Sequence, residues 1–213
     1  MAQTYNSLVV QIESYLDRTD ADTIAQIPNF IYQAQQRLAR ETKSLGQVQY
    51  INTQFIVIPV SNPVIQKPGR YRRVLSWQLG TGPTMSIRNQ LYLRSYEYCR
   101  AYWPDPTATG QPLYYCDYGF YDWLVVPSPD IAYPYEISYL ELSIPLSLAV
   151  QTNYYTNFAP DLLLYACLLE AIPYLKTDER IPVWQGMYDR ALASLNGQDE
   201  NRYLARSSNR ESD

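Results

Sequence analysis

The chain has 213 residues, of which 46% are hydrophobic, and a formal net charge of -4. This length allows one large domain or two small ones, with a core that needs neither disulfides nor metals. The sequence contains no histidine, which excludes Ser-His and Cys-His nucleophile pairs and removes the commonest metal ligand, while the acidic balance argues against a dedicated nucleic-acid-binding protein.

Two amphipathic helices are expected at the N-terminal end. Residues 4–17 place apolar side chains at three- and four-residue steps, with Thr4 as a plausible N-cap. A second helix is expected to start near Pro28, since proline suits the first turn of a helix, and to end at Gly46.

From Val48 the pattern becomes that of strands separated by turns. Strands are predicted around residues 55–60 and over 71–79, 85–92, 113–117, 123–126 and 135–142. Pro104 ends a short helix predicted over residues 95–103. Tyr118-Gly119-Phe120 predicts the turn of a β-hairpin. The sequence of residues 80–83 predicts a turn between strands and does not match a phosphate-binding loop.

Helical patterning returns at Pro160-Asp161, where proline suits a first turn and the carboxylate faces the positive end of the helix dipole. Residues 162–172 are apolar nearly all round, which predicts a helix buried in the middle of a bundle. The last clear helix carries a narrow packing stripe of Ile181, Trp184, Tyr188, Ala191 and Leu195. A frayed helix through Tyr203-Leu204 and then a disordered end are expected in the polar stretch 197–213.

These elements predict an α+β fold, in which the N- and C-terminal helices form a helical bundle and an antiparallel β-rich region is inserted between them. The expected domains are residues 1–46 with 155–200 for the bundle, 47–154 for the inserted β-rich region with its one short helix, and 201–213 for a flexible C-terminal tail.

The composition favours contacts with partners over much of the surface. There are 22 tyrosines and 4 tryptophans, and only three of the 17 basic residues are lysines. Tyr, Trp and Arg are enriched in the buried parts of interfaces, where Lys is depleted; a compositional bias of the source genome is the alternative. Six aromatic residues crowd one hairpin, and alternation predicts that about half of them face outward: Tyr114, Tyr115, Tyr118, Phe120, Tyr121 and Trp123.

The other candidate sites have structural explanations. Asp178-Glu179 precede a helix, so capping is preferred to paired catalytic carboxylates or a metal site. Arg70 and Arg72 share one face of a predicted strand and Arg73 lies on the other; contact with acidic groups of a protein partner is preferred to contact with phosphates. The three cysteines, Cys99, Cys116 and Cys167, are expected to be reduced structural thiols.

We expect no metal, no cofactor and no membrane segment, and a soluble protein made inside the cell. No apolar stretch approaches the roughly 20 residues of a membrane-spanning helix, and the N-terminus lacks the layout of a signal peptide.

Several segments resemble the head-to-tail adaptor family of short-tailed phages. They are Ile27 to Ile31 with Arg37 and Arg40, Pro112 to Pro129, Tyr135 to Tyr139, and Pro160 to Ala171. The resemblance extends from about residue 5 to residue 196, and its motifs are packing and turn motifs rather than catalytic ones.

The resemblance implies a non-enzymatic virion protein in the neck of the phage. Its copies would form a dodecameric ring between the portal protein and the tail tube or nozzle protein, around genomic DNA that passes without specific binding. The β region would face the tail, which gives Tyr118, Phe120, Tyr121, Arg70 and Arg72 as candidate contacts. The C-terminal segment would reach the portal or a neighbouring subunit, with candidate contacts Arg202, Tyr203, Leu204 and Arg206.

Two alternatives remain at this stage. One is another tail-completion or minor tail protein with the same order of helices and strands. The other is a carboxylate-dependent hydrolase of glycans, which would need two carboxylates in a cleft.

Overall fold

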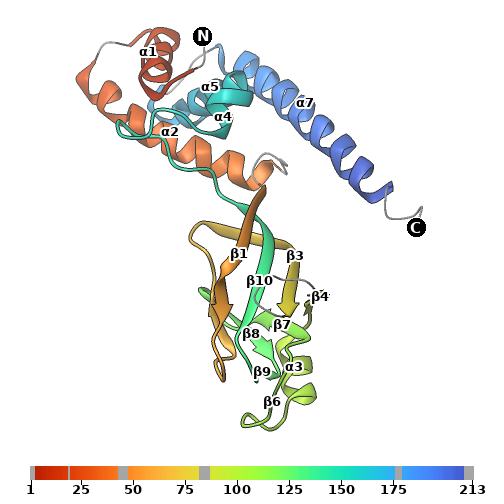
Figure 1. The fold of residues 1–213 in the computed structure, drawn as a ribbon. Helices are drawn as coiled ribbons and strands as arrows, with labels where there is room; N and C mark the ends of the chain where they lie inside the picture. Colours follow the sequence, from red (N-terminus) through yellow and green to blue (C-terminus); the bar gives the residue numbers. More distant parts are fainter. Residues whose placement is uncertain (1–2, 19, 43–47, 82–86, 176–178, 209–213) are drawn as a thin grey trace. The chain divides into compact units, whose positions relative to one another are not determined.

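The computed structural model describes residues 3–18, 20–42, 48–81, 87–175 and 179–208. The chain divides into two compact units, which are Met1–Gln47 with Leu142–Asp213, and Val48–Glu141. We call them the helical unit and the β unit. Both helices and sheets are present, which confirms the predicted α+β class (Figure 1).

The helical unit starts with two capped helices. Helix α1 spans Tyr5–Leu16 with Thr4 as its N-cap, as predicted. Helix α2 spans Ala21–Glu41, so the start expected near Pro28 was wrong. Asp20 caps the helix by accepting a hydrogen bond from the Thr23 backbone N–H at 3.1 Å. This cap starts the helix earlier and leaves Pro28 inside it. Thr42 is its C-cap, ahead of the expected end at Gly46.

The other helices of this unit follow the β unit in the sequence. They are α4 (Tyr154–Phe158), which was not predicted, α5 (Pro160–Glu170), α6 (Ile172–Leu175) and α7 (Ile181–Ser208). Pro160 occupies the first turn of α5, as expected. Figure 1 shows the C-terminal half of α7 extending beyond the other helices of this unit.

Helix α5 lies at the centre of the helical unit and contacts α1, α2, α4 and α7. Its buried residues are Leu162, Leu163, Leu164, Ala166, Cys167, Leu168 and Leu169, which confirms the prediction of a buried helix. Trp184, Tyr188 and Leu195 of α7 are buried in the same core, and Ile181 and Ala191 pack against it. The predicted stripe of the last helix is therefore its packing face.

A buried glutamine forms hydrogen bonds with the segment that precedes α4. The side-chain oxygen of Gln35 on α2 accepts hydrogen bonds from the Leu146 backbone N–H at 3.1 Å and from the Asn153 side-chain amide at 3.0 Å. Asn153 also caps α4 through the backbone N–H of Thr156. Since buried polar groups are stabilising only when paired, this network fixes the path of the chain into α4.

The described residues of the β unit form two four-stranded sheets and one small two-stranded sheet. The first has the order β1 (Val48–Ile58), β10 (Tyr133–Glu141), β3 (Tyr71–Thr81), β4 (Ile87–Gln90). The second has the order β2 (Val64–Gln66), β8 (Asp122–Val126), β7 (Tyr114–Asp117), β5 (Tyr92–Leu93). A small third sheet joins β6 (Thr109–Gly110) and β9 (Ser128–Pro129). The pairs β5–β7 and β6–β9 are parallel, while the other pairs are antiparallel.

Strand β8 is covered on both sides. Trp123 and Val125 belong to an aromatic core with residues of the first sheet, in which the Trp77 and Trp123 rings lie 4.8 Å apart. Leu124 and Val126 instead pack with Cys99 and Trp103, on or next to helix α3 (Tyr96–Tyr102). Because successive side chains of a strand point to opposite faces, four consecutive apolar residues indicate this double burial.

The predicted strand over residues 85–92 is two strands that belong to different sheets. Strand β4 pairs with β3, and the Leu91 backbone N–H donates to the Trp77 carbonyl at 2.9 Å. The chain then crosses to the second sheet, where the Tyr92 backbone N–H donates to the Leu113 carbonyl at 3.1 Å. The turn expected at residues 80–83 extends outside the described residues.

Candidate partner-binding surfaces

The tip of the β7–β8 hairpin presents three aromatic side chains to solvent. Phe120 is 87% exposed, Tyr121 is 69% exposed and Tyr118 is 48% exposed. Tyr115 and Trp123, on the adjoining strands, are buried. The prediction that about half of these aromatics face outward is therefore confirmed, and the structure places three of the predicted tail-contact residues within one four-residue tip.

Lys67 forms hydrogen bonds to the backbone of this tip and so fixes its conformation. Its ammonium donates to the carbonyls of Gly119 at 2.8 Å and Phe120 at 3.4 Å, and it forms an ion pair with Asp117 at 2.9 Å. The Lys67 backbone N–H also donates to the Tyr121 carbonyl at 2.7 Å. The Lys67 side chain is only 9% exposed, so its hydrogen bonds are sheltered from water.

Two aromatic rings next to the Lys67 ammonium stabilise it in the position from which it binds the tip. Lys67 Nζ lies 5.6 Å from the ring centre of Tyr71 and 6.0 Å from that of Trp123, and these two rings meet edge to face at 5.0 Å. Cation–π attraction therefore adds to the hydrogen bonds. A tip fixed in this way loses little conformational entropy when a partner covers it.

Replacing Lys67 with methionine tests this role. We expect the free energy of unfolding of the β unit to fall by about 2 kcal/mol, because charge-assisted hydrogen bonds to two carbonyls are lost. Asp117 is 68% exposed, so its ion pair contributes little of this change. The measurement is urea unfolding followed by tryptophan fluorescence.

The matched control for this variant is Arg88→Met. It removes a cation that is 55% exposed and that pairs with Glu136 at 3.2 Å, and should cost at most about 1 kcal/mol. Equal losses in the two variants would contradict the special role of Lys67.

Arg70 and Arg72 do not share a strand face, so that part of the prediction was wrong. Arg70 precedes β3 in the left-handed region, with φ of 59°, and its guanidinium pairs with Glu141 at 2.6 Å. The pairing of β3 with β10 shifts register between Tyr71 and Arg73, and Arg72 and Arg73 are both exposed. A bulge of this kind breaks the simple alternation on which the expectation depended.

A second aromatic surface, which the sequence reading did not single out, lies on α3 and β7. Tyr98 and Tyr102 stack at 6.4 Å, and both meet the ring of Tyr114 edge to face at 5.3 and 4.9 Å. Arg94 lies over Tyr98 and Tyr114 at 5.6 and 5.5 Å. The signal in the sequence was the spacing of Tyr98 and Tyr102, since residues four apart are neighbours on a helix.

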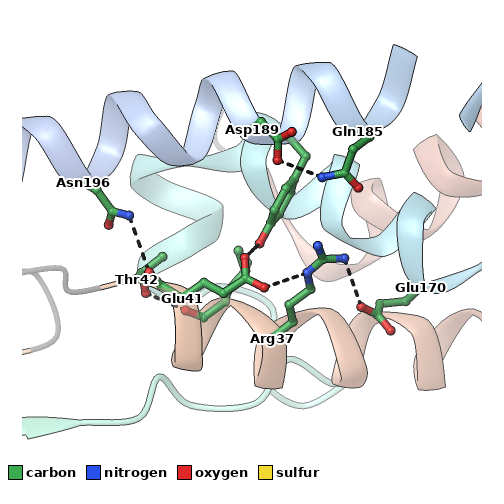
Figure 2. A network of polar contacts seen from close by, with 9 residues as sticks. Arg37, Glu41, Thr42, Glu170, Gln185, Asp189 and Asn196 are labelled. Atoms are coloured by element: carbon green, nitrogen blue, oxygen red, sulfur yellow. Dashed lines mark hydrogen bonds and ion pairs between the residues drawn. The ribbon is translucent and has the colours of Figure 1, made fainter. Parts of the chain in front are cut away.

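A polar network ties α7 to α2 and α5 (Figure 2). Arg37 pairs with Glu41 at 3.0 Å and with Glu170 at 3.6 Å, and its guanidinium lies 4.5 Å from the ring centre of Tyr188. The Tyr188 hydroxyl donates to the Glu41 carboxylate. Figure 2 also shows Asn196 reaching the end of α2, where its amide donates to the Glu41 carbonyl at 3.5 Å. Arg37, part of one segment that carried the family resemblance, therefore helps to position α7.

Two groups of this network have shifted pKa values, and both shifts favour the protonated form. Burial and the hydrogen bond to Glu41 raise the pKa of Tyr188, which keeps its hydroxyl protonated as a donor. Burial lowers the pKa of Arg37, but the hydrogen bond to Glu41 and the nearby Tyr188, Glu41 and Glu170 raise it overall.

Stability is expected to fall at alkaline pH. Burial raises the pKa of Tyr115 to about 12, and burial with the Asp130 hydrogen bond raises that of Tyr133 to about 12. An unfolded tyrosine has a pKa of about 10, so above that pH the unfolded chain has lost protons that the folded chain keeps. Their stabilising contribution is complete below about pH 10 and decreases as pH rises towards about 12.

Urea midpoints measured between about pH 8 and pH 11.5 check this expectation. In Tyr133→Phe the midpoint should fall less steeply with pH, because one of the two titrating hydroxyls is absent. A midpoint that stayed constant above about pH 10 would contradict the expected loss of stability.

The predicted C-terminal contacts lie on the last turns of α7. Arg202, Tyr203, Leu204 and Arg206 belong to its helical backbone, which runs through Ser208. Their side chains lie outside the described residues, so their contact with the portal or a neighbouring subunit stays a prediction. Asp178 also lies outside the described residues, and Glu179 is exposed.

The cysteines are free and buried, as expected. Cys99 and Cys116 nevertheless share one small core with Trp103, although they are 17 positions apart in sequence. Burial raises the pKa of Cys116 to about 12 and also raises those of Cys99 and Cys167, so none is a ready thiolate nucleophile. Among the described residues, no cluster of three or more Cys, Asp or Glu could hold a metal ion.

The exposed aromatics of the tip and the tyrosines of α3 are features suited to contacts with partner proteins. The comparison with protein families agrees: a family model described as SU10 adaptor protein matches residues 3–211. The chain belongs to this family, and is a structural adaptor of a bacteriophage particle. This membership confirms the resemblance to phage adaptors. A search of curated proteins found no match. None of the described helices is long and apolar enough to cross a membrane.

Proposed function

We propose that the chain is the head-to-tail adaptor of its particle, and that its copies form a ring between the portal protein and the tail tube or nozzle protein. The observation that carries this proposal is the hairpin tip, where Phe120 is 87% exposed on a backbone held by Lys67, whose side chain is 9% exposed. A large aromatic side chain kept in water on a fixed support is suited to filling a pocket of a partner.

Ring formation needs different contacts on different neighbours. A subunit in a ring uses heterologous contacts, in which one surface meets a different surface of the next copy. This chain offers two separate aromatic surfaces in the β unit, the hairpin tip and the tyrosines of α3, while the helical unit contributes α7. Such a distribution supports contacts with the tail partner and with copies of the chain.

The C-terminal turns of α7 are proposed as the contact with the portal or with a neighbouring subunit. They carry Arg202, Tyr203, Leu204 and Arg206, of the types enriched in interface cores apart from the leucine. The network around Arg37 and Tyr188 supports this role, because it fixes the part of α7 from which these turns continue.

DNA is proposed to pass through the ring without being gripped. The net charge of -4 supports this, since a wall that neutralised many phosphates would bind the genome and slow its passage. No enzymatic step, metal or cofactor is assigned. The protein would be made in the host cytoplasm and act in the neck of the virion.

The test is to mix the purified chain with its portal protein and to image the mixture by negative stain. We expect a ring on the portal. Alone at micromolar concentration, the chain should be monomeric by mass photometry, because single heterologous contacts are weak without a template. Portals that stay bare would refute the proposal, and capture by the tail-tube protein alone would indicate another tail-completion protein.

A further inference from the structure

Two thiols of the β unit lie against each other. Cys99 belongs to α3 and Cys116 to β7, and both are buried, at 0% and 1% exposure. They share one small core with Trp103, Leu124 and Val126, and the two thiols share a hydrogen bond. A single buried cysteine packs like any small apolar residue, but two thiols in direct contact can also react with each other.

The two elements are close enough for a covalent bond between these sulfurs. Residues of α3 lie within 8 Å of residues of β7, measured between Cα atoms. A disulfide spans about 4.4–6.8 Å between its Cα atoms, so thiols already in contact need only a small movement of α3. Strand alternation supports this geometry, since Tyr115 faces the aromatic core and the next residue, Cys116, faces α3.

A hollow of about 540 Å³ gives small molecules an approach to this pair. Its lining residues belong to β5, α3, β7 and the link between β5 and α3: Leu93, Arg94, Ser95, Tyr96, Cys116 and Asp117. Because Cys116 is only 1% exposed, a reagent in the hollow reaches its sulfur when α3 moves away. Helix α3 has seven residues, and so short a helix should open more readily than the sheets.

The closed pair is protected from reagents. Burial raises the pKa of Cys116 to about 12 and also raises that of Cys99, so neither is a thiolate near neutral pH. In the host cytoplasm, cellular thiols also keep such a pair reduced. A particle released from its host enters an oxidising medium, in which disulfides form and persist.

We propose that Cys99 and Cys116 are a site of oxidative modification, at which an intramolecular disulfide joins α3 to β7 after the particle leaves its host. The bond would act on the second aromatic surface, because Tyr98 and Tyr102 belong to α3, and Tyr114, which both rings contact, belongs to β7. Joining the two elements covalently would hold these three rings together. This inference goes beyond the proposed function and depends on no partner protein.

The oxidant is a low-molecular-weight disulfide such as oxidised glutathione. The thiolate of Cys116 attacks one sulfur of the reagent, which forms a mixed disulfide and releases one glutathione thiolate. The thiolate of Cys99 then attacks the Cys116 sulfur, which closes the protein disulfide and releases the second glutathione thiolate. The protein loses two electrons, which reduce the glutathione disulfide, and the two thiol protons pass to the two released glutathione thiolates.

The test exposes the full chain to excess oxidised glutathione at about pH 8.5, where an exposed thiol is half ionised. Thiols that remain are alkylated in denaturant and identified by mass spectrometry. Of the three thiols, those of Cys99 and Cys116 should disappear and that of Cys167 should remain. Digestion with trypsin and an aspartate-directed protease should give residues 95–100 linked to residues 105–116, and dithiothreitol should separate them.

Cys167 provides the matched control. It is also fully buried, but it lies in the helical unit, and no second cysteine belongs to its core among the described residues. Cys167→Ser should leave the cross-link unchanged, whereas Cys99→Ala should abolish it. Hydrogen exchange of α3 should be at least about tenfold slower in the oxidised chain than in the reduced one, because the bond restrains opening. The reagent should not slow this exchange in Cys99→Ala.

Persistence of all three thiols, a glutathione adduct in place of the cross-link, or links to Cys167 as frequent as the link between Cys99 and Cys116 would overturn the inference. Disulfides between chains, seen as dimers on a non-reducing gel, would also overturn it. Unchanged exchange of α3 in the cross-linked chain would refute the effect on the tyrosine surface. The assay needs neither portal nor tail protein, so its failure and the failure of the imaging test are distinguishable.

Discussion

Replacing Phe120 and Tyr121 together with alanine is expected to abolish capture of the chain by its tail partner while leaving its fold intact. The two rings meet edge to face at 4.8 Å and are 87% and 69% exposed, so they contribute little to the core. Exposed aromatic anchors at the centre of an interface typically account for 2 kcal/mol or more each, so we expect a loss of affinity of roughly a thousandfold. Pull-down with the tail-tube or nozzle protein and a thermal melt give the two readouts.

The matched control is Phe158→Ala. Phe158 is 72% exposed and, like the tip residues, contacts a neighbouring aromatic ring, that of Tyr154, but it belongs to the helical unit. Its removal should leave capture unchanged. If the tip variant still bound its partner normally, the β7–β8 tip would not be the tail contact.

Tyr188→Ala is expected to lower the free energy of unfolding of the helical unit by about 3–5 kcal/mol, the cost typical of deleting a buried aromatic ring. Tyr188 is 1% exposed, and its loss also removes the hydroxyl donor to Glu41 and the ring beneath Arg37. Because this ring fixes α7, assembly on the portal should fail with it. Urea unfolding and the imaging assay measure the two effects.

Tyr188→Phe separates packing from hydrogen bonding. It keeps the ring, and Glu41 is 36% exposed and regains water, so the expected cost is about 1 kcal/mol. We expect this variant to form rings normally. A cost for Tyr188→Phe as large as that for Tyr188→Ala would mean that the hydroxyl, not the ring, holds α7.

Local sequence signals located most helices and strands well. Thr4 caps α1 where expected, because short polar side chains satisfy the free N–H groups of a first turn. Ser95, the first residue of the predicted short helix, is the N-cap of α3. The start of α2 was misplaced because proline was weighted above the Asp20 cap, and Pro28 is instead accommodated inside the helix. Helix α4 has only five residues, too few for a periodic pattern to reveal it.

The features missed were those that depend on distant parts of the chain. The aromatic tip was predicted from alternation along β7 and β8, but nothing local indicates that Lys67, about 50 positions earlier, holds it. The chain crossing at Leu91 and the bulge at Arg72 are properties of sheet pairing, which period-two patterning does not report. The neighbourhood of Cys99 and Cys116 is likewise set by the packing of α3 on the second sheet.

The rate at which the Lys67 amine reacts with a reagent can report on the conformation of the hairpin tip. Lys67 is the one lysine between positions 48 and 141 of the sequence, its side chain is 9% exposed, and its ammonium donates hydrogen bonds to two carbonyls. An acylating reagent added to the particle would therefore modify this amine slowly while the hairpin is closed. The rate of its modification, read by mass spectrometry of a single tryptic fragment, would follow how often the aromatic tip opens, before and after the neck is assembled.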